Sequence, residues 1–188
     1  MRKALYILGI LEDADVSWLA QAGHARQIGT DTVIIRQGVP IDSVFIVIDG
    51  ELMVYAAEIE IARLRAGEMV GEISFVDLRP PSASVKATVP AQVLEINKAV
   101  LRGKIRKDPG FAARFYLSVA TFLADRLRVT TARLSGGREA ADTEKEDFDE
   151  LGGDMLEHLA LASTRFDMMV KALAEKSTEQ RIPGAHAA

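Results

Sequence analysis

Hydrophobic positions change their spacing twice along the chain. Residues 4–22 place apolar side chains at mostly helical intervals, which predicts one or two short helices. Between residues 25 and 97 the pattern becomes a series of short β-branched runs separated by turn residues. Runs of this length at regular intervals predict a small antiparallel barrel or jelly roll. Asp49-Gly50, a pair that tolerates positive φ, predicts a tight hairpin between VFIVI and ELMVY.

Helical spacing returns after the strands. Residues 98–107 predict a short basic helix, whose charged side chains form either a solvated face or an electrostatic docking patch. Residues 111–134 contain no glycine or proline and predict one long helix with two apolar stripes. The stripes are Phe111, Phe115, Val119 and Phe122 on one side, and Tyr116, Leu123, Leu127 and Leu134 on the other. One stripe covers the barrel, and we expect the second to meet the same helix of another copy in a homodimer.

The C-terminal part has a different character. Residues 135–147 are small, polar and charged, which predicts an acidic linker, and residues 148–176 predict an amphipathic helix. Its Phe166, Met168 and Met169 either complete an internal core or form a docking surface for another protein. We therefore expect three parts, at residues 1–134, 135–147 and 148–188, the last being a helix with a frayed tail.

The composition indicates in which cellular compartment the protein is expected. The 188 residues include no cysteine, which excludes disulfides and cysteine-bound metals and fits a reducing cytosol. The longest uncharged apolar runs are far below the ~20 residues that cross a bilayer, so we expect no transmembrane helix. Acidic residues interrupt the apolar N-terminus at Glu12, Asp13 and Asp15, which argues against a signal peptide. A cytoplasmic protein is expected.

Charge and motifs exclude two classes of function. Residues 1–134 carry 17 basic and 15 acidic side chains, whereas residues 135–188 carry 6 and 12. The acidic C-terminal part also lacks a recognition helix followed by a wing, so we expect no DNA binding. No G-x-S-x-G, H-E-x-x-H or Walker motif occurs, and the histidines, His24, His158 and His186, are scattered. We expect neither an enzyme nor a metal site.

The order of the predicted parts resembles the cyclic nucleotide-binding domain of catabolite-activator-type regulators, protein kinase A regulatory subunits and some ion channels. The resemblance covers about residues 5–134, without the DNA-binding domain of the regulators. Three segments carry it, namely ARQIGTDTVIIRQGVPIDS, VFIVIDGELMVY and AGEMVGEISFVDLRPPSASVKA. It implies an α+β fold, an antiparallel β-roll or jelly-roll barrel with N-terminal helices and a long C-helix. The amphipathic helix beyond it is an extra C-terminal element.

The third segment falls where the family has its phosphate-binding cassette. Gly71 allows close approach of the backbone, and Glu72 can accept a hydrogen bond from a ribose 2′-hydroxyl. Free N–H groups at the start of the helix near Glu72 suit a cyclic phosphate. The resemblance implies that Ile73, Ser74, Ser82 and Ala83 complete the cassette, with Ser82 and the Ala83 N–H facing the phosphate. The implied ligand is cyclic AMP or cyclic GMP, with no further cofactor.

The long helix supplies two more candidates. Arg126 and Thr130 fall where the family's helix contacts the base, although both could instead be polar interruptions of the dimer seam.

One position departs from the family pattern. The arginine that pairs with the phosphate falls at Pro81, which removes a charge-assisted bond worth about 1.5–3 kcal/mol, roughly 10- to 150-fold in affinity. Arg79, two residues earlier, either replaces it or is a surface residue. Two hypotheses follow. The chain is a cyclic nucleotide sensor that signals through its C-terminal helices, or a ligand-insensitive dimeric scaffold whose helix 148–176 docks on an unknown protein.

Overall fold

The computed structural model describes residues 6–134 and 153–179. The strands of these residues form two antiparallel sheets of four, in the orders β1-β8-β3-β6 and β2-β7-β4-β5. Their bounds are β1 (His24–Ile28), β2 (Val33–Ile35), β3 (Ser43–Asp49), β4 (Leu52–Ala56), β5 (Ile59–Leu64), β6 (Met69–Val70), β7 (Ser84–Ala87) and β8 (Ala91–Asn97). The predicted antiparallel β-roll of an α+β protein is confirmed.

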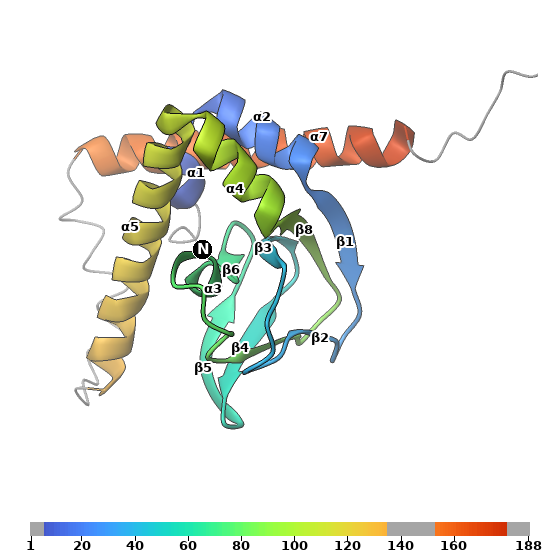
Figure 1. Ribbon diagram of the computed structural model, residues 1–188, viewed down its shortest axis with the longest axis vertical. Coiled ribbons are helices and arrows are strands. Elements are labelled where there is room, and N and C mark those ends of the chain that lie inside the picture. Colours follow the sequence, from blue (N-terminus) through green and yellow to red (C-terminus); the bar gives the residue numbers. More distant parts are fainter. Residues whose placement is uncertain (1–5, 135–152, 180–188) are drawn as a thin grey trace, which may run out of the picture.

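Helices stand before, within and after the roll. They are α1 (Tyr6–Ile10), α2 (Asp13–Ala22), α3 (Ile73–Val76), α4 (Lys98–Lys107), α5 (Pro109–Leu134) and α7 (Gly153–Glu179). In Figure 1, α5 runs along the side of the roll and α7 lies across α1 and α2 at one end. No helix of the described ranges is long and apolar enough to span a membrane. The predicted linker 135–147, the predicted start of the last helix at 148 and the tail beyond 179 lie outside the described residues.

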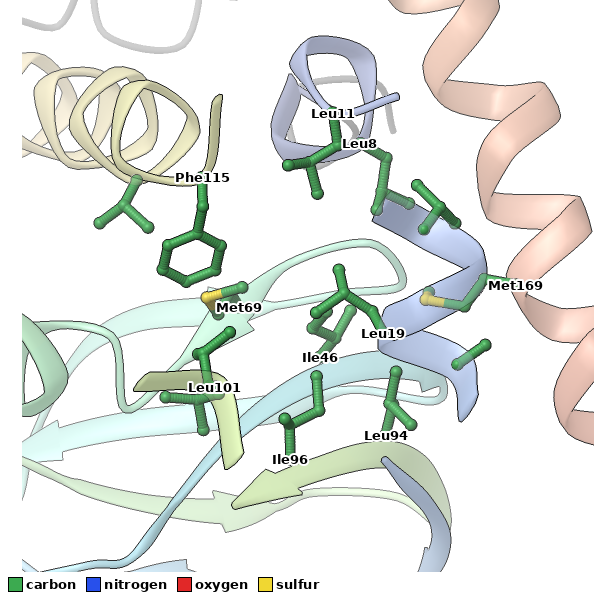
Figure 2. Packing of buried hydrophobic residues seen from close by; sticks show 14 of the residues in the cluster. Leu8, Leu11, Leu19, Ile46, Met69, Leu94, Ile96, Leu101, Phe115 and Met169 are labelled. Atoms are coloured by element: carbon green, nitrogen blue, oxygen red, sulfur yellow. The ribbon is translucent and has the colours of Figure 1, made fainter. Parts of the chain in front are cut away.

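β3 is the central strand of the fold and is buried on both faces. Val44, Ile46 and Ile48 belong to the core beneath the helices, whereas Phe45 and Val47 belong to the core between the sheets. A strand with two buried faces needs apolar residues at every position, which explains the unbroken run VFIVI. Figure 2 shows the helix-side core, where side chains of β3 and β8 meet those of α1, α2, α5 and α7.

The predicted hairpin at Asp49-Gly50 is wrong. β3 pairs with β6 and β8, while β4 pairs with β5 and β7, so the turn carries the chain from one sheet to the other. Gly50 has a φ of +83°, and a Cβ on it would lie 2.5 Å from the carbonyl oxygen of Pro90. The glycine is therefore required by the crowded corner between the sheets and not by a two-residue hairpin.

The hairpin of this region joins β4 to β5 and has no typical turn residues. Its turn contains Ala57 and Glu58, with φ values of +48° and +66°. Tight hairpin turns favour asparagine, aspartate or glycine at such positions, so the composition gave no signal for this one.

α7 packs on the N-terminal helices of its own chain. Ala162, Met169 and Leu173 are buried in the helix-side core, Phe166 is half-buried and Met168 is exposed. Two cations on α7 bind the C-terminal ends of α1 and α2. Arg165 donates to the carbonyl oxygen of Gly9 at 2.9 Å, and Lys176 donates to those of Gln21 and Gly23 at 2.7 and 2.8 Å. Of the two uses expected for this helix, the structure shows the internal core.

The sheet-switching corner gives a stability prediction. Gly50→Ala should destabilise the protein by the strain of a left-handed alanine, about 1–2 kcal/mol, plus about 1–3 kcal/mol from overpacking against Pro90 and Ala91. Gly38→Ala is the matched control, because Gly38 has a φ of +76° and a Cβ on it would have nothing within 4 Å. Urea unfolding of both variants measures the difference. Equal losses would contradict a steric role for Gly50.

Candidate functional site

The turn between β6 and α3 places the cassette. Gly71 has a φ of +89°, and a Cβ on it would lie 3.1 Å from the carbonyl oxygen of Ser43 and 3.2 Å from Cδ1 of Ile41. Only glycine fits this conformation and this close approach. The turn delivers Glu72 directly into the start of α3, so that its side chain points beneath the helix and is 1% exposed.

A small cavity of about 60 Å³ adjoins this turn. Side chains of four strands, β2, β4, β6 and β7, form its apolar wall, and the cassette and α5 form the rest. The lining residues are Ile35, Val54, Val70, Gly71, Glu72, Ile73, Ser74, Pro81, Ser82, Ala83, Val85 and Arg126. Every cassette residue proposed from the sequence except Arg79 is therefore gathered around one cavity, together with one arginine from the long helix.

Glu72 forms an ion pair with Arg126 across this cavity. Arg126 Nη1 donates to Glu72 Oε1 at 2.7 Å, and its guanidinium carbon lies 4.4 Å from the centroid of the Phe122 ring. A longer contact of 3.5 Å joins Arg126 Nη2 to the carbonyl oxygen of Met69. The resemblance implied that Arg126 contacts the base of the nucleotide. The structure instead pairs it with Glu72, the carboxylate that is expected to bind the ribose.

The ion pair satisfies Glu72 only in part. Among the described residues, Glu72 Oε2 has no hydrogen-bond partner. Burial raises the pKa of the Glu72 carboxyl above its ordinary value, and the nearby charge of Arg126 lowers it only part of the way back. A buried carboxylate with a spare acceptor oxygen can take a hydrogen bond from a hydroxyl group.

Two candidates from the sequence lie elsewhere. Arg79 follows Leu78, whose φ is +63°, and lines a different and larger cavity, while its backbone N–H donates to Asp77 Oδ1 at 3.0 Å. Thr130 is exposed and its hydroxyl donates to the carbonyl oxygen of Arg126 on its own helix. In this structure Arg79 does not replace the arginine missing at Pro81. Arg126 is the one cation among the described residues that line the small cavity.

Sequence reasoning missed the role of Lys98. Its ammonium group donates to Ser74 Oγ at 2.8 Å, and the Ser74 hydroxyl in turn donates to the carbonyl oxygen of Gly71 at 3.1 Å. In the sequence Lys98 is one of several charges on a basic helix, and nothing in the pattern indicates a contact with Ser74, 24 positions earlier.

The fold and this site together define a class of protein. It is a β-roll domain in which the one-turn helix α3 and the long helix α5 border a small cavity at the sheets. Residues 25–108 match the family model described as the cyclic nucleotide-binding domain, and this part of the chain is a domain of that family. The resemblance drawn from the sequence is confirmed.

Solved structures share the fold. A cyclic nucleotide-binding domain from Methylobacillus flagellatus is 22% identical, with a TM-score of 0.64 over 70% of this chain and 82% of that one. The Thermus thermophilus catabolite activator protein is 24% identical, with a TM-score of 0.57 over 89% of this chain and 85% of that one.

A curated protein of Rhodopseudomonas palustris is also similar. It is named "Putative potassium channel protein RPA4233" and is 28% identical over 134 residues, which are 67% of this chain. The match spans only 31% of that relative's length.

The ion pair gives a pH-dependent prediction. Arg126→Ala should leave the buried Glu72 carboxylate without a partner and cost about 3 kcal/mol near neutral pH. The folded-state pKa of Glu72 is already raised, and losing Arg126 raises it further. A raised carboxyl pKa favours folding most below the unfolded value, and this contribution is lost as pH rises through the folded value. The defect should therefore shrink on acidification.

Thermal unfolding of the wild type and Arg126→Ala across a pH series measures this effect. Arg126→Ala with Glu72→Gln is the control, because a neutral amide removes the titrating group and should flatten the difference. A defect of Arg126→Ala that is the same at every pH would show that the variant loses packing rather than a charge partner.

Proposed function

We propose that this chain is a non-enzymatic cyclic nucleotide-binding regulatory module that signals through its C-terminal helices, with cyclic AMP or cyclic GMP as ligand. The observation that carries the proposal is the convergence of Gly71, Glu72, Ser82 and Ala83 on one cavity, within the segment that matches the family. Glu72 accepts the ribose hydroxyl, Ser82 and the Ala83 N–H bind the phosphate, and Ile73 and Ser74 complete the cassette.

In the described structure the cavity is too small to hold such a ligand. The cavity of about 60 Å³ is far smaller than the roughly 300–1,000 Å³ of typical small-molecule sites. Arg126 occupies the space beside Glu72 that the ribose needs. Ligand entry therefore requires the guanidinium to leave the carboxylate, and because Arg126 belongs to α5, the ligand acts directly on the long helix.

The outer face of α5 supports a homodimer. Tyr116, Leu117 and Leu127 are 45%, 57% and 67% exposed, while Phe111, Phe115 and Phe122 on the opposite face are buried in the core. Exposed apolar side chains along one helix face are typical of an interface. A second copy of the same helix covers them with the fewest assumptions, and a ligand that shifts α5 would then be sensed at the dimer interface.

A ligand-insensitive scaffold is the second candidate. Pro81 removes the phosphate partner, and the Glu72–Arg126 pair fills the cavity, which favours a domain that has lost its ligand. In that case the domain serves as a dimeric adaptor. The protein partner of the C-terminal helix, the absence of DNA binding and the cytoplasmic location expected from the sequence stay predictions in both cases.

Thermal unfolding with ligand separates the two functions. Cyclic AMP, cyclic GMP or a cyclic dinucleotide at 100 times its dissociation constant should stabilise the module by about 2.7 kcal/mol, a rise of several degrees. Glu72→Ala should abolish the response, whereas Arg79→Ala should keep it because Arg79 lines another cavity. No response to any of these ligands would favour the scaffold. Loss of the response in Arg79→Ala would instead mean that Arg79 enters the site with the ligand.

The dimer is tested by analytical ultracentrifugation. Leu127→Asp should convert the dimer to a monomer, because it places a charge on the most exposed apolar side chain of the stripe. Ile59→Asp is the matched control, since Ile59 is also 67% exposed but belongs to strand β5 and not to the α5 stripe. A wild-type chain that sediments as a monomer, or equal effects of both variants, would contradict an α5 interface.

A further inference from the structure

A second cavity, of about 480 Å³, borders α3 and the start of α4. Its wall is formed by the segment before β3, by the segment after α3 and by the first turn of α4. The polar residues on this wall are Asp42, Ser74, Arg79, Asn97, Lys98 and Arg102. The volume is in the range of small-molecule sites, and none of these residues except Ser74 lines the smaller cavity.

Three cations from two segments face this second cavity. Lys98 is only 7% exposed, and its ammonium donates to Ser74 Oγ. Arg102 is fixed by a hydrogen bond from Nη2 to the carbonyl oxygen of Phe75 at 3.2 Å, with its guanidinium carbon 5.0 Å from the Phe75 ring centroid. Arg79 stands exposed at the edge. The cavity thus has one buried and one hydrogen-bonded cation in its wall and an exposed one at its rim.

Although Asp42 also lines this cavity, the positive charge of its wall is not neutralised by an ion pair within the described part of the chain. There, none of Arg79, Lys98 and Arg102 has a carboxylate within ion-pair distance. Burial lowers the pKa of Lys98, the charge of Arg102 lowers it further, and Asp42 and Asp77 oppose this only through space. Buried charges are normally paired, so an anion is the partner that this arrangement lacks.

We propose that this second cavity binds the phosphate group of a small anionic molecule, with Lys98, Arg102 and Arg79 as its cationic contacts. A phosphate offers several oxygens to two guanidinium groups and one ammonium at once, whereas a carboxylate offers two. The start of α4 does not provide the site, because the Asn97 side chain already accepts from the N–H groups of Ala99 and Val100. The proposal does not depend on cyclic nucleotide binding in the smaller cavity.

Isothermal titration with inorganic pyrophosphate tests the site on the full chain. Arg102→Ala and Arg79→Ala should each weaken binding on the order of ten-fold or more, the loss expected for one charge-assisted contact. Arg106→Ala is the matched control, since Arg106 is an exposed arginine of the same helix that does not line the cavity. Arg79 is exposed and makes no side-chain contact in the described residues, so its loss leaves folding intact and keeps the test valid if Arg102→Ala is unstable. Equal weakening by Arg106→Ala, or no measurable binding by the wild type, would overturn the proposal.

Amide NMR shifts locate the bound pyrophosphate. The signals of Asp42 and Ala99 beside the second cavity should move on titration, while those of Val54 and Val85 beside the smaller cavity should stay in place. Movement of Val54 and Val85 without Asp42 and Ala99 would assign the anion to the smaller cavity and overturn the second site.

Discussion

The ion pair between Glu72 and Arg126 joins the two parts of the molecule that matter for its function. Glu72 belongs to the cassette on the roll, and Arg126 belongs to the long helix, 54 residues later in the chain. This contact therefore links the cassette to the second half of α5 at the wall of the small cavity. The buried carboxylate, whose second acceptor oxygen has no partner within the described ranges, lies at the same point.

A second ion pair shows how unevenly α5 is held. Near the start of the helix, Arg114 donates from Nε to Asp15 Oδ2 at 2.6 Å and from Nη2 to Oδ1 at 3.1 Å. Burial tends to raise the pKa of Asp15, but the hydrogen bonds from Arg114 and from the Glu12 backbone N–H, together with the charge of Arg114, outweigh it and lower the pKa. Glu72, with one unpartnered oxygen among the described residues, has a raised pKa instead. The carboxylate at α2 thus has hydrogen bonds to both of its oxygens, whereas the one at the pocket keeps an acceptor oxygen free of a partner among the described residues.

The helices and strands could be predicted from the sequence better than the contacts between them. The short helices, the antiparallel roll, α4 and α5 could be predicted because their residues carry a local period that burial imposes. Asp49-Gly50 misled, since the same two residues suit a hairpin and a switch between sheets, and the choice depends on Pro90 and Ala91 across the corner. The cassette residues came from a contiguous motif. The positions of Arg79 and Arg126 could not be predicted, because side-chain direction is set by tertiary contacts: the turn at Leu78 and the ring of Phe122.

The Ser74 hydroxyl stands between the two cavities and has a fixed polarity. Lysine can only donate and a carbonyl can only accept, so the proton of Ser74 must point to Gly71 while its lone pair receives Lys98. Such a chain polarises in one direction, and each bond strengthens the other. Loss of the Lys98 bond would therefore weaken the Ser74 bond to the Gly71 carbonyl, so that this single oxygen atom connects the wall of the larger cavity with the turn beside the smaller one.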